Sequence, residues 1–174
     1  MTVQTNRAKT GLTGEFFVYS QLIKHDKNGF ITLGNAKAVD IIIVDSNKRA
    51  YYIDVKSTST LMKNSHNHSN YYDDIGLIGR WQLKLKPFWQ THSKNPDKTD
   101  YPFPDFYIFH NCQRPEKNYI LKGVDFVQIM HGKIDSIMSR FDSSVLLPKH
   151  INSQCDLCEF CFNQDSLNNW SMLP

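Results

Sequence analysis

The chain has 174 residues and a formal net charge of +3 at pH 7, which permits binding to nucleic acid without requiring it. Hydrophobic residues make up 40% of the sequence, enough to build the core of one domain. It contains no run of 18 apolar residues and no apolar signal-peptide stretch near Met1, so we expect no membrane span and a cytoplasmic location.

The first predicted element is a helix from Gly11 to His25, preceded by a polar, frayed arm from Met1 to Lys9. Its apolar residues recur at intervals of four, three and four, as one face of a helix does: Leu12, Phe16, Tyr19 and Ile23. Glu15 lies at the border of this face, from where it can reach the edge of a sheet, although the helix dipole also favours a glutamate in a first turn. Gly29 is expected to end the helix, and a short strand to follow at Phe30 to Leu33.

Two apolar runs, Val39 to Val44 and Ala50 to Lys56, flank a polar turn and predict a β-hairpin. Antiparallel pairing brings the start of the first strand near the end of the second, so Asp40 is expected close to Asp54. Side chains alternate along a strand, which places Asp54 and Lys56 on the same face. The hairpin therefore gathers two carboxylates and an ammonium group at one edge of an apolar sheet.

Such a cluster next to a core persists mainly when its charges are paired or bind a metal ion. Hard oxygen ligands suit Mg²⁺, which binds through one or two carboxylates and keeps several waters. A bound Mg²⁺ lowers the pKa of a water and neutralises charge on a phosphate, and Lys56 could orient that water or stabilise the developing charge. The cluster thus predicts metal-assisted phosphodiester hydrolysis. The alternatives are a solvated strand edge for Asp54 and Lys56 and a turn residue for Asp40.

These residues resemble the PD-(D/E)XK nuclease superfamily: Glu15 in a Gly-Glu helix, Asp40 opening an apolar strand, and Asp54-Val55-Lys56 ending the hairpin. The order of elements is also similar, with a helix, a strand, the hairpin, and then a helix and a strand. The resemblance implies that Asp40, Asp54 and the Val55 carbonyl bind Mg²⁺, for which Mn²⁺ can substitute. It further implies that Glu15 assists, directly or through water, and that Lys56 is the catalytic lysine.

The resemblance covers the first third of the chain well, and its one departure is Val39, where the name-giving motif has proline. It implies a restriction endonuclease-like α/β domain over residues 1–150, with a mixed central sheet flanked by helices. We expect a Mg²⁺-dependent endonuclease acting on double-stranded DNA, and favour a type II restriction endonuclease because long inserts after Lys56 provide loops for reading bases. A homodimer is expected if both strands of a two-fold symmetric site are cut.

Three alternatives remain open at this stage. The first is a structure-selective nuclease, such as a Holliday junction resolvase. The second is a non-catalytic nucleic-acid-binding module on the same fold. The third is a structural or interaction protein in which the charged cluster is merely solvated.

The stretch from Gly79 to Lys86 alternates cleanly between apolar and polar residues and predicts a half-buried strand. Its outward residues are mostly basic and are candidate DNA contacts: Arg80, Gln82, Lys84 and Lys86. Such a face can follow phosphates, and Arg80 or Gln82 could also read base edges, although a plain exposed face is equally compatible. Lys37, in the loop before Asp40, is a further candidate contact.

In the rest of the chain, two loops are predicted, at Leu61 to Asp74 and Thr91 to Pro104. Two core strands are predicted at Asp105 to His110 and Asn118 to Leu121, and a short helix at Val124 to Met130. Gly132 is expected to end this helix. A cysteine-containing segment, residues 151–174, is expected to pack on the same domain.

The cysteines of this segment form a C-x2-C-x2-C motif: Cys155, Cys158 and Cys161. Without a secretory signal, a metal is a better explanation than disulfides. Structural Zn²⁺ with Cys112 or His150 as the fourth ligand is one reading. An iron–sulfur cluster or simple free thiols are the others.

Overall fold

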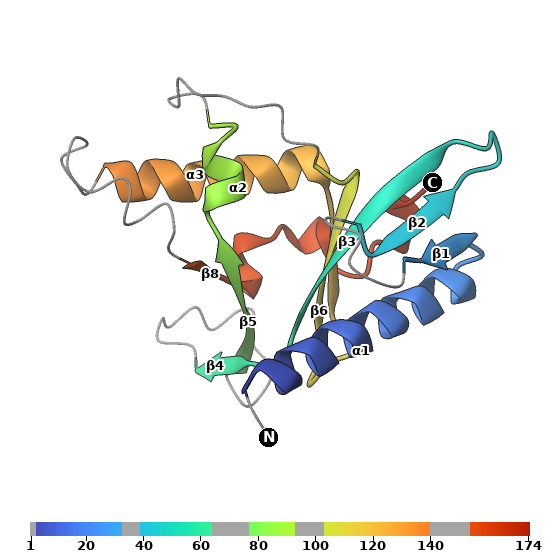
Figure 1. The fold of residues 1–174 in the computed structure, drawn as a ribbon, viewed down its shortest axis with the longest axis horizontal. Coiled ribbons are helices and arrows are strands. Elements are labelled where there is room, and N and C mark those ends of the chain that lie inside the picture. Colours follow the sequence, from blue (N-terminus) through green and yellow to red (C-terminus); the bar gives the residue numbers. More distant parts are fainter. Residues whose placement is uncertain (1–2, 33–38, 64–76, 93–102, 140–153) are drawn as a thin grey trace.

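The computed structural model describes residues 3–32, 39–63, 77–92, 103–139 and 154–174. The fold is built on a five-stranded sheet of order β1-β2-β3-β6-β7, in which β3 and β6 are parallel and the other neighbours antiparallel. Its strands are β1 (Gly29–Ile31), β2 (Ile41–Val44), β3 (Ala50–Thr58), β6 (Phe106–Asn111) and β7 (Asn118–Lys122). Figure 1 shows α3 (Gly123–Met138) across the top and α1 (Val3–Lys24) across the bottom, with the strands between them. The prediction of a mixed central sheet flanked by helices is confirmed.

The two faces of this sheet carry separate apolar cores. On β6, the buried side chains of Phe106 and Ile108 belong to a cluster with Val18 and Leu22 of α1. The alternate residues of β6 belong to a second cluster, formed with α3: Tyr107 and Phe109 with Phe126, Met130 and Ile134. Because the strand is buried on both faces, its first four residues form a continuous apolar run without alternation.

Helix α1 packs through a different face from the one that its apolar spacing suggested. The buried positions are Gly14, Val18 and Leu22, whereas the predicted face is largely open to solvent, with Leu12 46%, Phe16 50% and Ile23 57% exposed. A Cβ on Gly14 would lie 1.7 Å from Ser57 Oγ, so only glycine lets the helix approach β3 this closely. The helix carries two apolar rows, and periodicity alone could not choose between them.

The ends of α1 also differ from the prediction. The helix begins at Val3, inside the segment expected to be a frayed arm. It ends at a left-handed Asp26 (φ 56°), after which the Lys27 N–H donates to the Leu22 carbonyl at 2.9 Å. This is a Schellman-type ending with Asp26 where glycine is usual. Gly29 is therefore free to begin β1.

After β3 the chain departs from the element order that the superfamily resemblance implied. In place of a helix it forms β4 (Leu61–Lys63), β5 (Leu77–Lys84) and the one-turn helix α2 (Lys86–Trp89). The sheet face opposite α1 is covered over β6 by α3. Helix α3 runs through Gly132, which was expected to end it. A Cβ there would meet nothing within 4 Å, so this glycine costs only its propensity of about 1 kcal/mol.

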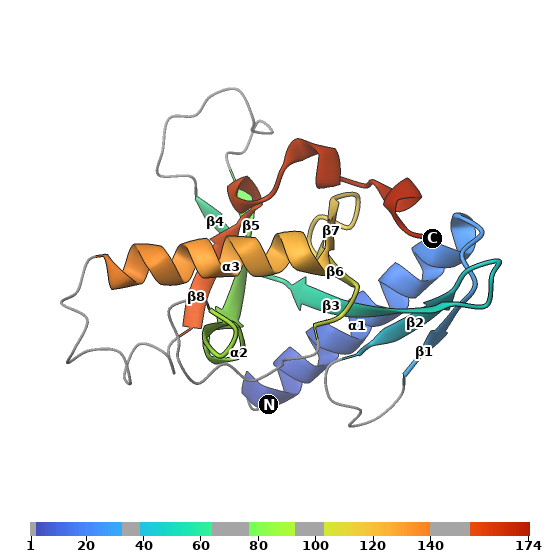
Figure 2. The same ribbon diagram turned by 90° about the horizontal axis from the view of Figure 1, so that it is seen from above.

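The C-terminal segment completes both cores. Strand β8 (Gln154–Cys158) pairs antiparallel with β5 in a three-stranded sheet of order β4-β5-β8, and Figure 2 shows the two side by side beneath α3. After β8 come three short 3-10 helices: η1 (Glu159–Cys161), η2 (Gln164–Ser166) and η3 (Trp170–Met172). Phe162 lies in the α3-side core, and Trp170 in the α1-side core.

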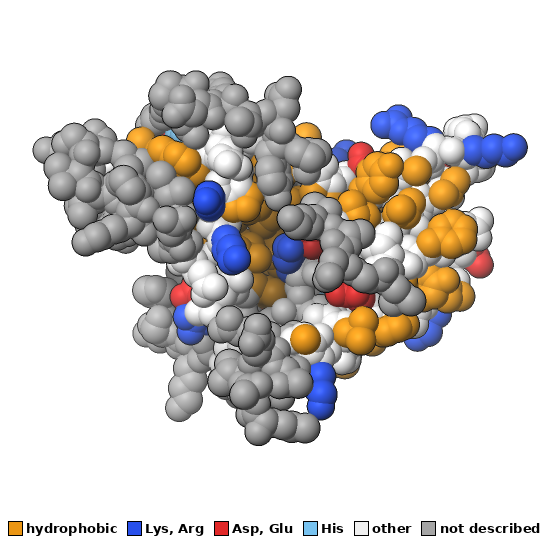
Figure 3. Space-filling model, in the orientation of Figure 1, with side chains coloured by type: hydrophobic (Ala, Val, Ile, Leu, Met, Phe, Trp, Pro, Cys, Tyr) orange, Lys and Arg blue, Asp and Glu red, His pale blue; other side chains and the backbone are white. Residues whose placement is uncertain are grey.

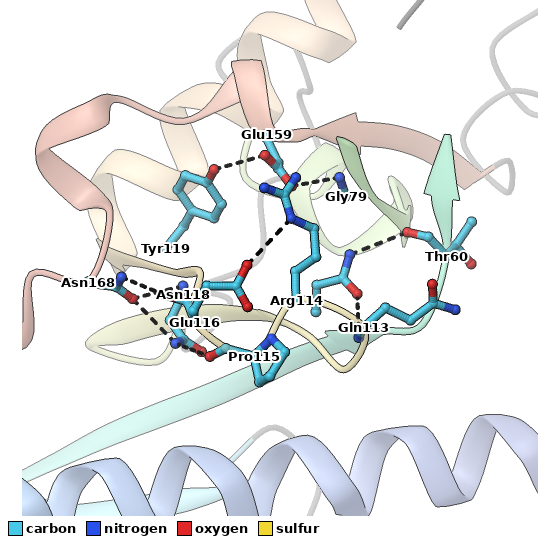
Figure 4. A network of polar contacts seen from close by, with 11 residues as sticks. Thr60, Gly79, Gln113, Arg114, Pro115, Glu116, Asn118, Tyr119, Glu159 and Asn168 are labelled. Carbon is cyan, nitrogen blue, oxygen red and sulfur yellow. Dashed lines mark hydrogen bonds and ion pairs between the residues drawn. The ribbon is translucent and has the colours of Figure 1, made fainter. Parts of the chain in front are cut away.

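A polar network fastens this segment to the sheets (Figure 4). The carboxylate of Glu159 accepts hydrogen bonds from the Gly79 N–H at 2.7 Å and the Tyr119 hydroxyl at 3.2 Å, and lies 3.6 Å from the Arg114 guanidinium. Asn168 bridges the Asn118 N–H and the Glu116 carbonyl. Buried polar groups stay buried only when paired in this way, so the network fixes the position of η1.

None of the helices within the described ranges is long and apolar enough to cross a membrane.

Candidate active site

The β2–β3 hairpin sets the geometry of the predicted site. Its turn is closed by Asp45, whose Oδ1 accepts from the backbone N–H groups of Asn47 and Arg49 at 2.9 and 2.8 Å. Lys48 adopts the left-handed conformation that such a turn needs (φ 64°). With the turn fixed, Val44 pairs with Ala50 and Ile41 with Ile53. Beyond this pair the ladder is irregular, because the Asp40 N–H donates to the Ile53 carbonyl at 3.0 Å. The carboxyl groups of Asp40 and Asp54 nevertheless meet at this end of the hairpin.

The structure brings the two carboxylates and the lysine together. The Asp54 side chain is 12% exposed, and its Oδ2 lies 2.7 Å from the Nζ of Lys56, which is 33% exposed. Asp40 Oδ2 accepts a hydrogen bond from the Val55 N–H at 2.7 Å, where a backbone carbonyl would stand if β2 continued. The Asp40 side chain therefore replaces a missing backbone hydrogen bond between the strands, and this bond fixes the position of its Oδ2.

The pKa of Asp40 is raised to about 7, first by burial and then by the negative charge of Asp54, while the hydrogen bond from Val55 opposes the shift. Burial also raises the pKa of Glu15 on α1, and the charge of Asp54 adds to this effect. A carboxylate whose ionisation is disfavoured in this way is stabilised by a nearby cation. The site thus has the electrostatic character of a cation site.

The groups that could bind a metal ion at the carboxylate cluster are all oxygen ligands. Within the described ranges, no three His, Cys, Asp or Glu side chains lie close enough to hold a metal ion, so Glu15 does not complete a set with Asp40 and Asp54. The N–H and C=O of a strand residue point toward the same neighbouring strand, so the Val55 carbonyl lies on the side of Asp40. Two carboxylates, this carbonyl and waters fit Mg²⁺, which uses few protein ligands.

The predicted DNA-contacting residues within the described ranges differ in exposure and position. Gln82 and Lys84 lie on β5 and are exposed, whereas Lys86 belongs to α2, two residues beyond the end of the strand. Arg80 is held by Asp156 of β8, with its Nη2 2.6 Å from Asp156 Oδ2, so part of its charge is already neutralised. Lys37 lies outside the described residues.

Figure 3 shows where these groups stand relative to the carboxylates. Basic side chains over β5 and α2 and acidic side chains near β3 lie on the same face of the molecule, on either side of a hollow with apolar side chains at its base. A backbone carrying negative charge could therefore meet the lysines and the carboxylates at once.

The four cysteines do not gather. Cys112 lies in the turn after β6, where its Sγ is 3.9 Å from the Thr10 carbonyl of α1. Cys158 and Cys161 lie 3.9 Å apart (Sγ–Sγ) in the C-terminal segment, and Cys155 lies on β8 opposite Leu83. In the part of the chain that is described, no three of them form a metal-binding set, and His150 lies outside it. The zinc prediction gains no support from this geometry.

Sequence reasoning missed two features of the site. The first is the contact of Gly14 with β3, which places Glu15 beside the end of this strand. The Ser57 hydroxyl at this contact is buried and has no hydrogen-bond partner among the described residues. The second is a row of apolar side chains next to the carboxylates, from Phe30, Ile42 and Tyr52. The uninterrupted apolar runs of the hairpin were a signal for this row, because they place apolar groups on both sheet faces.

A cavity of about 520 Å³ lies elsewhere, at the N-terminal end of α3. Its lining is mostly apolar, with residues such as Phe103, Phe106 and Val124, and its charged members are Asp105 and Lys122. None of the residues of the carboxylate cluster lines it, so it is separate from the candidate active site.

No protein-family model matches this chain, and no curated protein sequence matches it. Among solved structures, a bacterial homing endonuclease, I-Ssp6803I, is similar over 70% of this chain and 72% of its own, with 12% sequence identity and a TM-score of 0.41. At this TM-score and identity the likeness carries no functional conclusion, so the chemistry of the site has to follow from its own residues.

Proposed function

We propose that this protein is a Mg²⁺-dependent DNA endonuclease, with its active site at Asp40, Asp54 and Lys56. One observation carries the proposal: two carboxyl groups meet at the end of a hairpin, and a lysine lies 2.7 Å from one of them. The raised pKa of Asp40 supports it, because two crowded carboxylates without a cation are energetically unfavourable.

Each side chain has a definite role in this proposal. Asp40 and Asp54, with the Val55 carbonyl, would hold Mg²⁺ or Mn²⁺, which would supply an activated water and neutralise phosphate charge. Lys56 is partly exposed and would orient the attacking water or stabilise negative charge on the phosphate. Glu15 is near enough to feel the charge of Asp54 and would act through a water.

DNA is the proposed substrate because the lysines over β5 and α2 share a face with the carboxylates (Figure 3). Lys84 and Lys86 would contact phosphates, and Gln82 could reach a base edge. A type II restriction endonuclease remains the first reading, and it would act as a homodimer. A structure-selective nuclease is the second candidate, favoured by the apolar row beside the carboxylates.

The test is cleavage of supercoiled plasmid, linear duplex and four-way junction DNA in Mg²⁺, Mn²⁺ or EDTA. Wild-type protein should cut with either metal, and Asp54→Asn or Lys56→Ala should lower the rate at least about a hundredfold. Asp125→Asn is the matched control, because Asp125 is an exposed carboxylate in the first turn of α3 and should leave the rate unchanged.

The outcomes separate the candidate functions. Discrete plasmid fragments would support a restriction enzyme, and cutting confined to junctions a structure-selective nuclease. DNA that is bound but never cut under any metal would leave only a non-catalytic binding module. Light scattering of the same preparations would decide between a monomer and the expected dimer.

A further inference from the structure

A row of three apolar side chains crosses the sheet beside the carboxylates. Phe30 of β1 pairs with Ile42 of β2, and Ile42 pairs with Tyr52 of β3. The neighbouring residues Ile41 and Ile43 are buried against α1, so the row projects from the opposite face of the sheet. Phe30 is 64% and Tyr52 44% exposed.

The row shares this face with Asp54. Asp54 lies two residues from Tyr52 on β3, so these two side chains project from the same face, while the Asp40 side chain reaches along the edge of the sheet to the Val55 N–H. Two residues of an antiparallel strand span about 7 Å, so the Tyr52 end of the row lies about that far from Asp54. Figure 3 shows apolar side chains over β1 and the hairpin on the face that carries the acidic groups.

The row is exposed to solvent because α3 does not cover this part of the sheet. This helix covers the same face over β6 and β7, where Tyr107 and Leu121 are buried, and does not extend to β1 and β2. One exposed apolar side chain needs no explanation, but the exposed Phe30 and Tyr52 lie in register on either side of the half-buried Ile42, next to a charged site, and form a continuous surface. Lys48 and Arg49, both exposed, add positive charge at the hairpin tip.

We propose that Phe30, Ile42 and Tyr52 form a stacking platform for an unpaired nucleobase of the DNA strand whose phosphate meets Asp40 and Asp54. Flat aromatic side chains on a sheet are a common surface for bases of single-stranded nucleic acid, because every base presents a π-face. In a duplex these base faces are already stacked. The platform therefore selects substrates with unpaired nucleotides next to the cut, such as branched DNA or an overhang.

This inference rests on the proposed nuclease function, but it is tested by binding alone. Fluorescence anisotropy would be measured in EDTA with three labelled oligonucleotides: a single strand, a blunt duplex and a duplex with a single-stranded overhang. The variants are Phe30→Thr and Tyr52→Thr, which keep β-forming residues at exposed positions, and Tyr52→Phe, which keeps the ring. Phe16→Gln is the control, since Phe16 is equally exposed (50%) but lies on α1, which covers the other sheet face.

Wild-type protein should prefer the overhang and the single strand to the blunt duplex. Tyr52→Thr should lower affinity for the overhang about tenfold, and the double variant more, with little change for the duplex. Tyr52→Phe and Phe16→Gln should bind as wild type does. Equal losses for all three oligonucleotides, or none, would overturn the platform.

Two further outcomes distinguish the platform from the nuclease proposal and from other occupants. If Asp54→Asn abolishes cutting while the platform variants bind and cut normally, the nuclease stands and the platform fails. If Phe30→Thr and Tyr52→Thr convert a dimer to a monomer without changing DNA affinity, a second copy of the chain covers the row, which also overturns it. Circular dichroism of each variant confirms that the sheet is intact.

Discussion

The hairpin and the C-terminal segment both carry reactive side chains at regular spacing, yet only the hairpin gathers its groups. Asp40 and Asp54 are joined by a ladder whose register is fixed by a five-residue turn, so their meeting follows from backbone hydrogen bonds. Cys158 and Cys161 meet locally, but Cys112 is attached to another turn and contacts α1. Pairing across a closed hairpin is determined by the sequence nearby, whereas a fourth ligand from afar depends on the whole fold.

The largest effect expected of a single substitution comes from the contact that holds α1 against β3. Gly14→Val would put a side chain into Ser57, whose Oγ and Cβ lie 1.7 and 2.6 Å from an ideal Cβ. We expect it to lower the free energy of unfolding by about 3 kcal/mol, measured by urea denaturation. Gly132→Ala, at an open helical position, is the control and should stabilise by about 0.5–1 kcal/mol. Equal effects of the two changes would show that the approach of α1 is not tight.

The pH dependence of stability should report on the carboxylate pair. Between the unfolded pKa of 3.8 and the folded value of about 7, folded Asp40 keeps a proton that the unfolded chain has lost. Metal-free protein should therefore lose stability as pH rises through this window, by up to about 1.4 kcal/mol per pH unit. Thermal melts in EDTA would show this slope.

Two changes should flatten that slope. Asp40→Asn removes the titrating group, and Mg²⁺ stabilises the ionised pair in the folded state. Asp125→Asn, at an exposed position, should keep the slope. An unchanged slope in Asp40→Asn would show that the shifted titration belongs elsewhere.

The cysteines test the other side of the comparison, because their side chains, all within the described ranges, do not form a common site. If Cys112 and Cys158 shared a metal ion, serine at either position would cost several kcal/mol and the two effects would not add. The geometry instead predicts independent, additive effects of about 1 kcal/mol or less, since both side chains are partly buried and, among the described residues, neither belongs to a metal-binding set. Denaturation of the single and double variants would decide, and zinc content by mass spectrometry would check the result directly.

The smallest effect concerns Arg80, which Asp156 holds at the surface. Asp156→Asn breaks an exposed ion pair, so stability should change by less than about 0.5 kcal/mol. Freed of its partner, Arg80 would add a positive charge to the β5 face, and DNA affinity should rise about two- to threefold at low salt. Gln154→Ala, a neighbour on β8, is the control. Lower affinity in Asp156→Asn would mean that the pair positions Arg80 for DNA.

The sequence predicted the hairpin and its charged cluster because both follow from local pattern: β-branched runs, a polar turn and strict alternation. It also predicted β6 and β7, each of which has a short apolar run at its centre or start. It failed where two solutions were locally equivalent, as in the choice between the Leu12 row and the Val18 row of α1. It could not anticipate that Gly132 would be tolerated within α3, or that β4 and β5 would replace a helix, because tertiary packing decides both.

The position of β3 has a consequence for hydrogen exchange. Asp54 and Lys56 lie on the part of β3 that pairs with the buried strand β6, so their amides should exchange only when the centre of the sheet opens. Asp40 lies just before β2, whose other neighbour is the three-residue edge strand β1. Asp54 therefore belongs to the part of the sheet that is most protected from exchange, and Asp40 to an edge of the sheet that opens more easily. Cation binding would tie these two units together, and the protection gained should appear at the amides around Asp40.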